Sequence, residues 1–140
     1  MAFKTGRVDT WAATLEDRPG GLADKLGVLA NAGVNLEFMI ARRSPESPGK
    51  GVLFVTPIKG MAAARAARQA GFTPTASLHA VRVEGPNRPG QGQRIAQALA
   101  AQGLNLRGFS AAALGRKFVA HLALDSTAEA RKALRILEAL

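Results

Sequence analysis

The chain contains no cysteine and no tyrosine, and it has only two histidines. Without cysteine, neither disulfides nor thiolate metal ligands are available, so nothing requires an oxidising compartment. His79 and His121 lie in different halves with no paired carboxylates, so they form no recognisable metal-ligand set. Residues for nucleophilic catalysis are equally scarce, because no serine is placed to be activated by a histidine and an orienting acid. We therefore expect no metal, no cofactor and no enzymatic activity.

Long apolar runs are also missing from the sequence. No run approaches the roughly 20 residues that a helix needs to cross a bilayer. The first residues, Met1–Arg7, lack the apolar core of a signal peptide. We expect a cytoplasmic protein that does not associate with membranes.

Acidic residues are few relative to basic ones, which gives a formal net charge of +9 and a pI near 11.3. Such a charge raises nucleic acid or an acidic protein as candidate partners. However, the basic residues are scattered without a dense run, and aromatic residues that would stack on bases make up only 5% of the chain. Solvated faces of a basic protein explain this pattern, so nucleic-acid binding is not expected. A basic adaptor that docks on nucleic acid or on an acidic partner remains the alternative function.

The most informative feature of the sequence is an internal repeat. Asp17-Arg18-Pro19-Gly20 recurs as Asn87-Arg88-Pro89-Gly90, an offset of 87 − 17 = 70 residues, which is half of 140. The same offset relates Gly33-Val34-Asn35-Leu36 to Gly103-Leu104-Asn105-Leu106. A period of half the chain indicates one structural unit built twice, over residues 1–77 and 78–140. A core this small supplies only about 3 to 5 kcal/mol, so we expect interdependent units and self-association.

Hydrophobic periodicity predicts the same order of elements in both halves. In the first half the expected elements are a strand over Val8–Leu15, a helix over Gly20–Ala32, strands over Asn35–Arg42 and Val52–Thr56, and a helix over Met61–Ala70. An extended segment over Phe72–Glu84 is expected to serve both units. In the second half they are a helix over Gly90–Gln102, strands over Asn105–Leu114 and Phe118–Leu124, and a helix capped by Asp125-Ser126-Thr127. The second unit then lacks its last strand, and another segment or another chain should cover the open edge.

Glycine followed by an apolar residue marks the expected end of three of these helices. The three glycines are Gly33, Gly71 and Gly103. Glycine after a helix permits the left-handed conformation, and the apolar residue supplies the contact that commonly follows.

The repeated turn is the best candidate for a binding site. The first N–H groups of a helix have no internal partner and, with the helix dipole, favour an anion such as the carboxylate of an amino acid. Asp17 or Asn87 could accept a hydrogen bond from the ammonium group of the amino acid. Asn35 and Asn105, which begin the neighbouring strands, could complete a ring of polar groups around it. The same residue types also make self-capping turns without any ligand, so the residues alone leave both interpretations open.

Both copies resemble the ACT domain, a small ligand-sensing module of amino-acid metabolism. The matching features are a Pro-Gly turn, an amphipathic helix and a Gly-apolar-Asn-apolar step, found at Leu15–Leu22 with Ala32–Leu36 and at Asn87–Gly90 with Gln102–Leu106. The resemblance implies an α+β fold of two ferredoxin-like βαββαβ units with antiparallel sheets, the second lacking its final strand. It also implies that amino acids bind at an interface between units.

The resemblance also implies which residues bind the ligand. In a serine-sensing member of the family, the Asn before Arg-Pro-Gly and the Asn of the later step hold the ligand. The expected ligand-binding residues are Asp17, Arg18, Pro19, Gly20, Gly21, Leu22, Asn35, Asn87, Arg88, Pro89, Gly90, Gln91 and Asn105. Two departures stand out: Asp17 replaces the amide, and Gln91-Gly92 replaces the usual small-apolar pair. The implied function is non-catalytic regulation by an amino acid, in a homodimer that acts on a partner enzyme.

Overall fold

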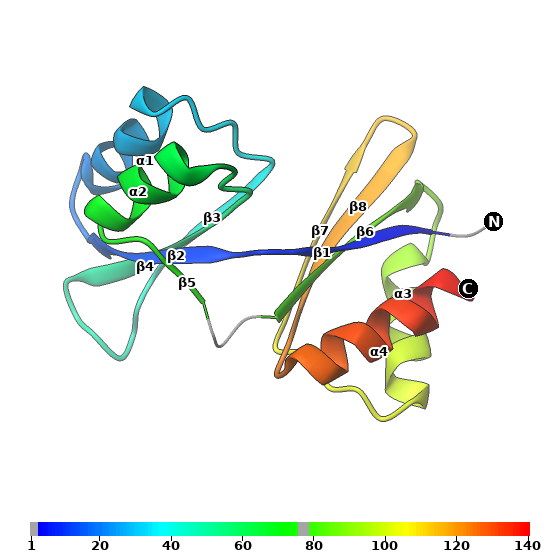
Figure 1. The fold of residues 1–140 in the computed structure, drawn as a ribbon. Helices are drawn as coiled ribbons and strands as arrows, with labels where there is room; N and C mark the ends of the chain where they lie inside the picture. Colours follow the sequence, from blue (N-terminus) through cyan, green and yellow to red (C-terminus); the bar gives the residue numbers. More distant parts are fainter. Residues whose placement is uncertain (1–2, 76–78) are drawn as a thin grey trace. The chain divides into compact units, whose positions relative to one another are not determined.

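The computed structural model describes residues 3–75 and 79–140, which form two four-stranded sheets and four helices (Figure 1). In chain order the elements are β1 (Lys4–Val8), β2 (Trp11–Glu16), α1 (Gly21–Asn31), β3 (Phe38–Arg43), β4 (Lys50–Thr56), α2 (Met61–Gln69), β5 (Thr73–Pro74), β6 (His79–Pro86), α3 (Gln91–Ala101), β7 (Gly108–Leu114), β8 (Lys117–Leu124) and α4 (Thr127–Glu138). The chain divides into two compact units. Asp9–Thr75 forms one unit, here called the inserted unit. The other unit, here called the split unit, contains β1 together with all the elements from β6 to α4.

The two sheets have the same strand order. The order is β3-β4-β2-β5 in the inserted unit and β7-β8-β6-β1 in the split unit, and every pair is antiparallel. In each unit two middle strands lie between two edge strands. One edge strand, β3 or β7, follows the first helix of the unit, and the other, β5 or β1, completes the sheet on the opposite side. This is the ferredoxin-like βαββαβ arrangement, so the expected α+β fold is confirmed.

The last strand of the split unit comes from the beginning of the chain. β1 pairs antiparallel with β6, with Lys4 opposite Glu84 and Val8 opposite Ala80. The edge that was expected to need a cover is therefore covered by another segment of the same chain. The expected division at residues 77 and 78 differs from the observed one, because it assigns β1 to the first unit. The single strand expected over Val8–Leu15 is likewise replaced by two strands in two different sheets.

Phe3 explains why β1 belongs to the split unit. Its side chain is only 5% exposed and lies in a core with Val81 and Val83. The phenyl ring also lies over Gly85, where an added Cβ would come within 2.5 Å of the ring. The Arg94 guanidinium stacks on the same ring, 5.4 Å from its centroid. These contacts form only when β1 lies beside β6.

Each unit has a separate hydrophobic core. In the inserted unit α1 and α2 lie side by side (Figure 1), and Lys25 of α1 donates a hydrogen bond to the carbonyl oxygen of Ala70, just after α2. The buried side chains of this core are Trp11, Ala13, Leu15, Leu29, Leu53, Val55, Ala67 and Phe72. The split core is built in the same way from β6, β8, α3 and α4, with Phe3 added.

The predicted helix ends are confirmed. Gly33, Gly71 and Gly103 have φ angles of 75°, 91° and 76°. The apolar residue after each donates its N–H to the carbonyl five positions earlier, at 2.9 to 3.0 Å. The expected cap of the last helix is also present, because Ser126 Oγ accepts from the N–H of Glu129 at 3.1 Å.

The segment expected to be extended over Phe72–Glu84 contains two strands. β5 contributes two residues to the inserted sheet, and β6 begins the split sheet at His79. The part of this segment at 76–78 lies outside the described residues.

Candidate functional site

The two copies of the turn fold in the same way. Gly20 and Gly90 both have left-handed φ angles, 84° and 82°. The residue after each glycine donates its N–H to the carbonyl of the arginine in the motif, at 3.0 Å in the first turn and 3.3 Å in the second. Among the residues that the structure describes, no side chain caps α1 or α3. The first N–H groups of both helices, at the positive end of the dipole, therefore lie at a repeated turn.

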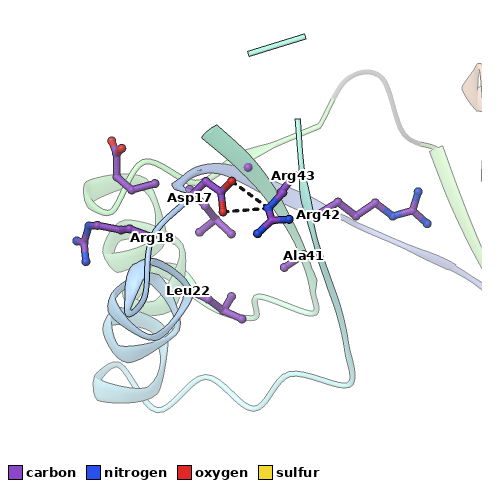
Figure 2. Close-up of a pocket in the computed structure, with 9 residues that line it drawn as sticks. Asp17, Arg18, Leu22, Ala41, Arg42 and Arg43 are labelled. Carbon is purple, nitrogen blue, oxygen red and sulfur yellow. Dashed lines mark hydrogen bonds and ion pairs between the residues drawn. The ribbon is translucent and has the colours of Figure 1, made fainter. Parts of the chain in front are cut away.

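A cavity of about 170 Å³ lies against the first turn (Figure 2). Its wall combines the turn and α1 with the ends of β2, β3 and β4, and the lining residues are Leu15, Glu16, Asp17, Arg18, Leu22, Ala41, Arg42, Arg43 and Gly51. Leu22 is 40% exposed and contributes apolar surface to this cavity. Three predicted site residues, Asp17, Arg18 and Leu22, are thus brought together.

An ion pair joins the turn to the end of β3. Arg43 Nε lies 3.0 Å from Asp17 Oδ2 and 3.3 Å from Asp17 Oδ1 (Figure 2). The Arg43 side chain is 85% exposed and that of Asp17 is 35% exposed. An exposed pair of this kind contributes little to stability, about 1 kcal/mol or less. Both charges are therefore accessible to a ligand.

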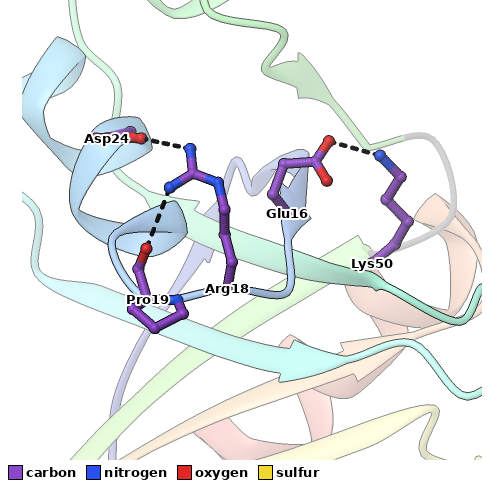
Figure 3. Close-up of polar contacts among 5 residues, drawn as sticks. All are labelled: Glu16, Arg18, Pro19, Asp24 and Lys50. Atoms are coloured by element: carbon purple, nitrogen blue, oxygen red, sulfur yellow. Dashed lines mark hydrogen bonds and ion pairs between the residues drawn. The ribbon is translucent and has the colours of Figure 1, made fainter.

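The other charges at the turn are directed elsewhere (Figure 3). Arg18 pairs with Asp24 of α1 at 2.9 Å and donates to the Pro19 carbonyl oxygen at 3.1 Å. Lys50 pairs with Glu16 at 2.6 Å, and its hydrogen bond holds the pKa of the Glu16 carboxyl below its usual value. Lys50 and Asp24 do not line the cavity, so of these ion pairs only that of Asp17 and Arg43 has both members in its wall.

Asn35 lies at the opposite end of α1 from Asp17. It lines a second cavity of about 460 Å³ together with Glu37 and Lys59. The 11 residues of α1 separate the two positions, and a helix of that length spans about 16 Å. The polar ring expected from Asp17 and Asn35 does not form within one unit. Asn105 likewise follows the end of α3, whereas Asn87 precedes its start.

One backbone contact is shared by the two turns: the Asp17 N–H donates to the Gly49 carbonyl oxygen at 3.0 Å, and the Asn87 N–H donates to the Arg116 carbonyl oxygen at 2.8 Å. The side chains of the second turn differ from those of the first, because Asn87 Nδ2 lies 3.4 Å from the Gly115 carbonyl oxygen. Gln91 is only 4% exposed, and its Nε2 donates to the Pro86 carbonyl oxygen at 2.7 Å. Arg88, Pro89 and Gly90 are exposed. Gln91 was expected to bind ligand, but its amide is directed into the unit.

Sequence reasoning missed Arg43. It lies 26 residues from Asp17, on a strand that was expected to end one residue earlier. The repeat contains a sign of the special role of Arg43, because the equivalent residue 70 positions later is Ala113, which carries no charge. Ala41 and Gly51 were also missed, since small residues on neighbouring strands mark a cavity only after the strands are paired.

The part of the chain that the structure describes offers few other kinds of site. Across residues 3–75 and 79–140, no group of three or more His, Asp or Glu side chains is placed to hold a metal ion. Nor is any helix within these ranges long and apolar enough to span a membrane. Of the two cavities described in the inserted unit, the one beside Asn35 is the larger, and the one beside Asp17 lies at the repeated turn.

Residues 13–67 match the family model described as the ACT domain. The match lies within the inserted unit, where it begins in β2, includes the first turn and ends in α2. No curated protein sequence matches the chain. The first unit is thus similar to an ACT domain at the level of sequence.

Solved structures share the fold over both units. The protein BT0572 from Bacteroides thetaiotaomicron superposes with a TM-score of 0.77 and 19% identity, over 94% of this chain and 88% of that chain. The ligand-free regulatory subunit of aspartate kinase from Thermus thermophilus gives 0.65 and 19%, over 98% and 95% of the two chains. The regulatory subunit of aspartate kinase from Thermus flavus gives 0.60 and 18%, over 98% and 95%. At these identities the likeness shows the fold alone.

Proposed function

We propose that this chain is a non-catalytic regulatory protein built from two ACT units, and that it binds an amino acid at the turn of the inserted unit. The observation that carries the proposal is the cavity beside Asp17, because it lies at the turn that the ACT resemblance assigns to the ligand. The likeness of both units to aspartate kinase regulatory subunits supports the tandem arrangement.

The cavity offers a partner for each part of an amino acid. The Asp17 carboxylate accepts hydrogen bonds from the ammonium group, in a charge-assisted contact. The uncapped N–H groups at the start of α1 attract the carboxylate. Leu22 and Ala41 supply apolar surface for a small side chain. The volume of about 170 Å³ suits a small ligand.

Ligand binding would be transmitted through the strand that forms the other wall. Arg43 is the last residue of β3, which is an edge strand of the inserted sheet. A ligand between Asp17 and β3 changes the contact that joins them, and so biases whatever assembles on that edge. Coupling of this kind is reciprocal, so a partner enzyme that binds the liganded form also tightens ligand binding.

Asp17→Ala is expected to weaken amino-acid binding by about tenfold or more, because a charge-assisted hydrogen bond contributes about 1.5 to 3 kcal/mol. The matched control is Glu46→Ala, which removes an exposed carboxylate from the same unit, one that does not line the cavity. Calorimetric titration of both variants measures the difference. Equal affinities for the two variants would show that Asp17 does not hold the ligand.

The proposed homodimer uses β7 (Gly108–Leu114). This strand is an edge of the split sheet, with Leu114 79% exposed. The equivalent edge strand of the inserted sheet, β3, carries Arg42 and Arg43, and charged side chains on an edge strand oppose pairing with another chain. The equivalent residues on β7 are Ala112 and Ala113. Copies of a chain with net charge +9 repel each other over most of their surface. The neutral β7 is therefore where a second copy can approach and pair antiparallel about a two-fold axis.

Ala112→Lys is expected to weaken dimerisation by about tenfold, because the two-fold axis brings the new charges near each other across the paired strands. The control is Ala100→Lys, which adds the same charge on the exposed face of α3. Sedimentation velocity over a range of concentrations gives the dimer constant. A wild-type chain that stays monomeric would contradict the homodimer, and an unaffected Ala112→Lys dimer would contradict the use of β7.

A further inference from the structure

The two turns have similar backbones around the repeated glycine, so their side chains can be compared at equivalent positions. Gly20 and Gly90 differ by only 2° in φ. The helical N–H of Asp24 donates to the Gly20 carbonyl at 2.9 Å, and that of Arg94 donates to the Gly90 carbonyl at the same distance. The repeat therefore allows a comparison, position by position, of two sites on one scaffold.

The first difference is the charge pair. Asp17 and Arg43 form an ion pair at the cavity. Their counterparts 70 positions further on are Asn87 and Ala113, both uncharged. The Asn87 side chain instead lies against the turn between β7 and β8, with Nδ2 3.4 Å from the Gly115 carbonyl oxygen. Anion and cation thus occur together in the inserted unit, and both are replaced in the split unit.

The second difference is the residue that begins each helix. Gly21 lies so close to the preceding strand that an added Cβ would come within 2.2 Å of the Glu16 carbonyl oxygen. Its counterpart Gln91 extends into the split unit, where it is 4% exposed and donates to the carbonyl of Pro86, the residue equivalent to Glu16. The glutamine side chain therefore ties strand and helix together at the second turn.

The third difference is the apolar residue at the cavity. Leu22 lines the cavity of the inserted unit. Its counterpart is Gly92, and an added Cβ there would lie 3.8 Å from the Phe109 ring. A residue of β7 thus approaches the helix start in the split unit, where the inserted unit has accessible cavity surface.

From these three differences we infer that the turns have divided their roles. The inserted turn binds a zwitterion, with Asp17 on its ammonium group and with Arg43, beside the first N–H groups of α1, on its carboxylate. The split turn is a structural lock closed by Gln91. Each chain therefore binds one ligand. Arg43 is the specificity-determining residue, because it requires a ligand that carries an anion beside its cation. This inference rests on the proposed function for its ligand, but the lock itself does not depend on any ligand.

Calorimetric titration with each standard L-amino acid tests the division of roles. We expect one ligand per chain, at least about tenfold weaker binding in Arg43→Ala, and less than about twofold change in Asn87→Ala. The methyl ester and the N-acetyl derivative of the same amino acid should both fail to bind. Two ligands per chain, or equal losses in Arg43→Ala and Asn87→Ala, would overturn the division while leaving the proposed function intact.

A melt without ligand tests the lock. Gln91→Ala is expected to lower the melting temperature of the chain by about 3 °C or more, because it removes a buried hydrogen bond and leaves the Pro86 carbonyl without it. Gln93→Ala, an exposed change two residues further along α3, should leave the melt unchanged. If the two variants melt alike, Gln91 is not a lock. If no amino acid binds wild-type protein, the proposed function fails, whereas the Gln91 result still decides whether the second turn is locked.

Discussion

Replacing Phe3 with alanine is expected to lower the free energy of unfolding of the split unit by about 3 to 5 kcal/mol, the usual cost of removing a buried phenyl ring. The ring is 5% exposed, packs with Val81 and Val83, and lies over Gly85. Its loss also weakens the docking of β1 and so uncovers the edge of β6. Hydrogen exchange at the β6 amides reports on this unit alone, which a melt of the whole chain does not.

Phe109→Ala serves as the comparison for Phe3→Ala. Phe109 belongs to the same unit but is 37% exposed, so less apolar surface returns to water when its ring is removed. We expect exchange at β6 to rise strongly in Phe3→Ala and weakly in Phe109→Ala. Equal and small effects would show that the N-terminal strand does not complete this sheet.

Gly21→Ala and Gly27→Ala are expected to change stability in opposite directions, although both replace a glycine of α1. An added Cβ at Gly21 would lie 2.2 Å from the Glu16 carbonyl oxygen, so backbone must move, at a cost of about 1 to 3 kcal/mol. At Gly27 nothing lies within 4 Å of an added Cβ. That change should stabilise the inserted unit by about 0.5 to 1 kcal/mol, through the higher helix propensity of alanine.

Exchange at the β2 and β4 amides measures the stability of the inserted unit in both variants. Gly21→Ala should also weaken amino-acid binding, since the displaced backbone carries the first N–H groups of α1 and the wall of the cavity. Gly27→Ala should bind as the wild type does. Destabilisation of similar size in both variants would mean that the close approach of the turn to Glu16 is not what makes glycine necessary.

The repeat made much of the fold predictable. The turns, the helix ends and the cap at Ser126 were predictable because their hydrogen bonds join residues only a few positions apart in the sequence. β1 was not predictable in this way. Lys4–Val8 is short, contains a glycine and has no clear alternation of apolar residues. Its placement is decided by Phe3 and by pairing with a strand about 75 residues away, which no local pattern encodes.

The site was predictable only in part, for a related reason. Asp17 and Leu22 belong to the turn and helix that the motif identifies, and both line the cavity. Arg43 reaches the same cavity from β3, so its role depends on the pairing of strands. Asn35 was assigned to the same ring from its place in the motif, but a helix of 11 residues separates it from Asp17. Residues that are conspicuous in one motif need not meet within one unit.

The central claim, that the inserted turn binds an amino acid, is tested most directly by a thermal melt of the wild-type chain against each standard amino acid at millimolar concentration, with Asp17→Ala measured alongside. A ligand at about 100 times its dissociation constant stabilises the folded chain by about 2.7 kcal/mol, which shifts the melt by several degrees. We expect a shift for one chemical class of amino acid, and its loss in Asp17→Ala. No shift with any amino acid, or the same shift in Asp17→Ala, would contradict the claim.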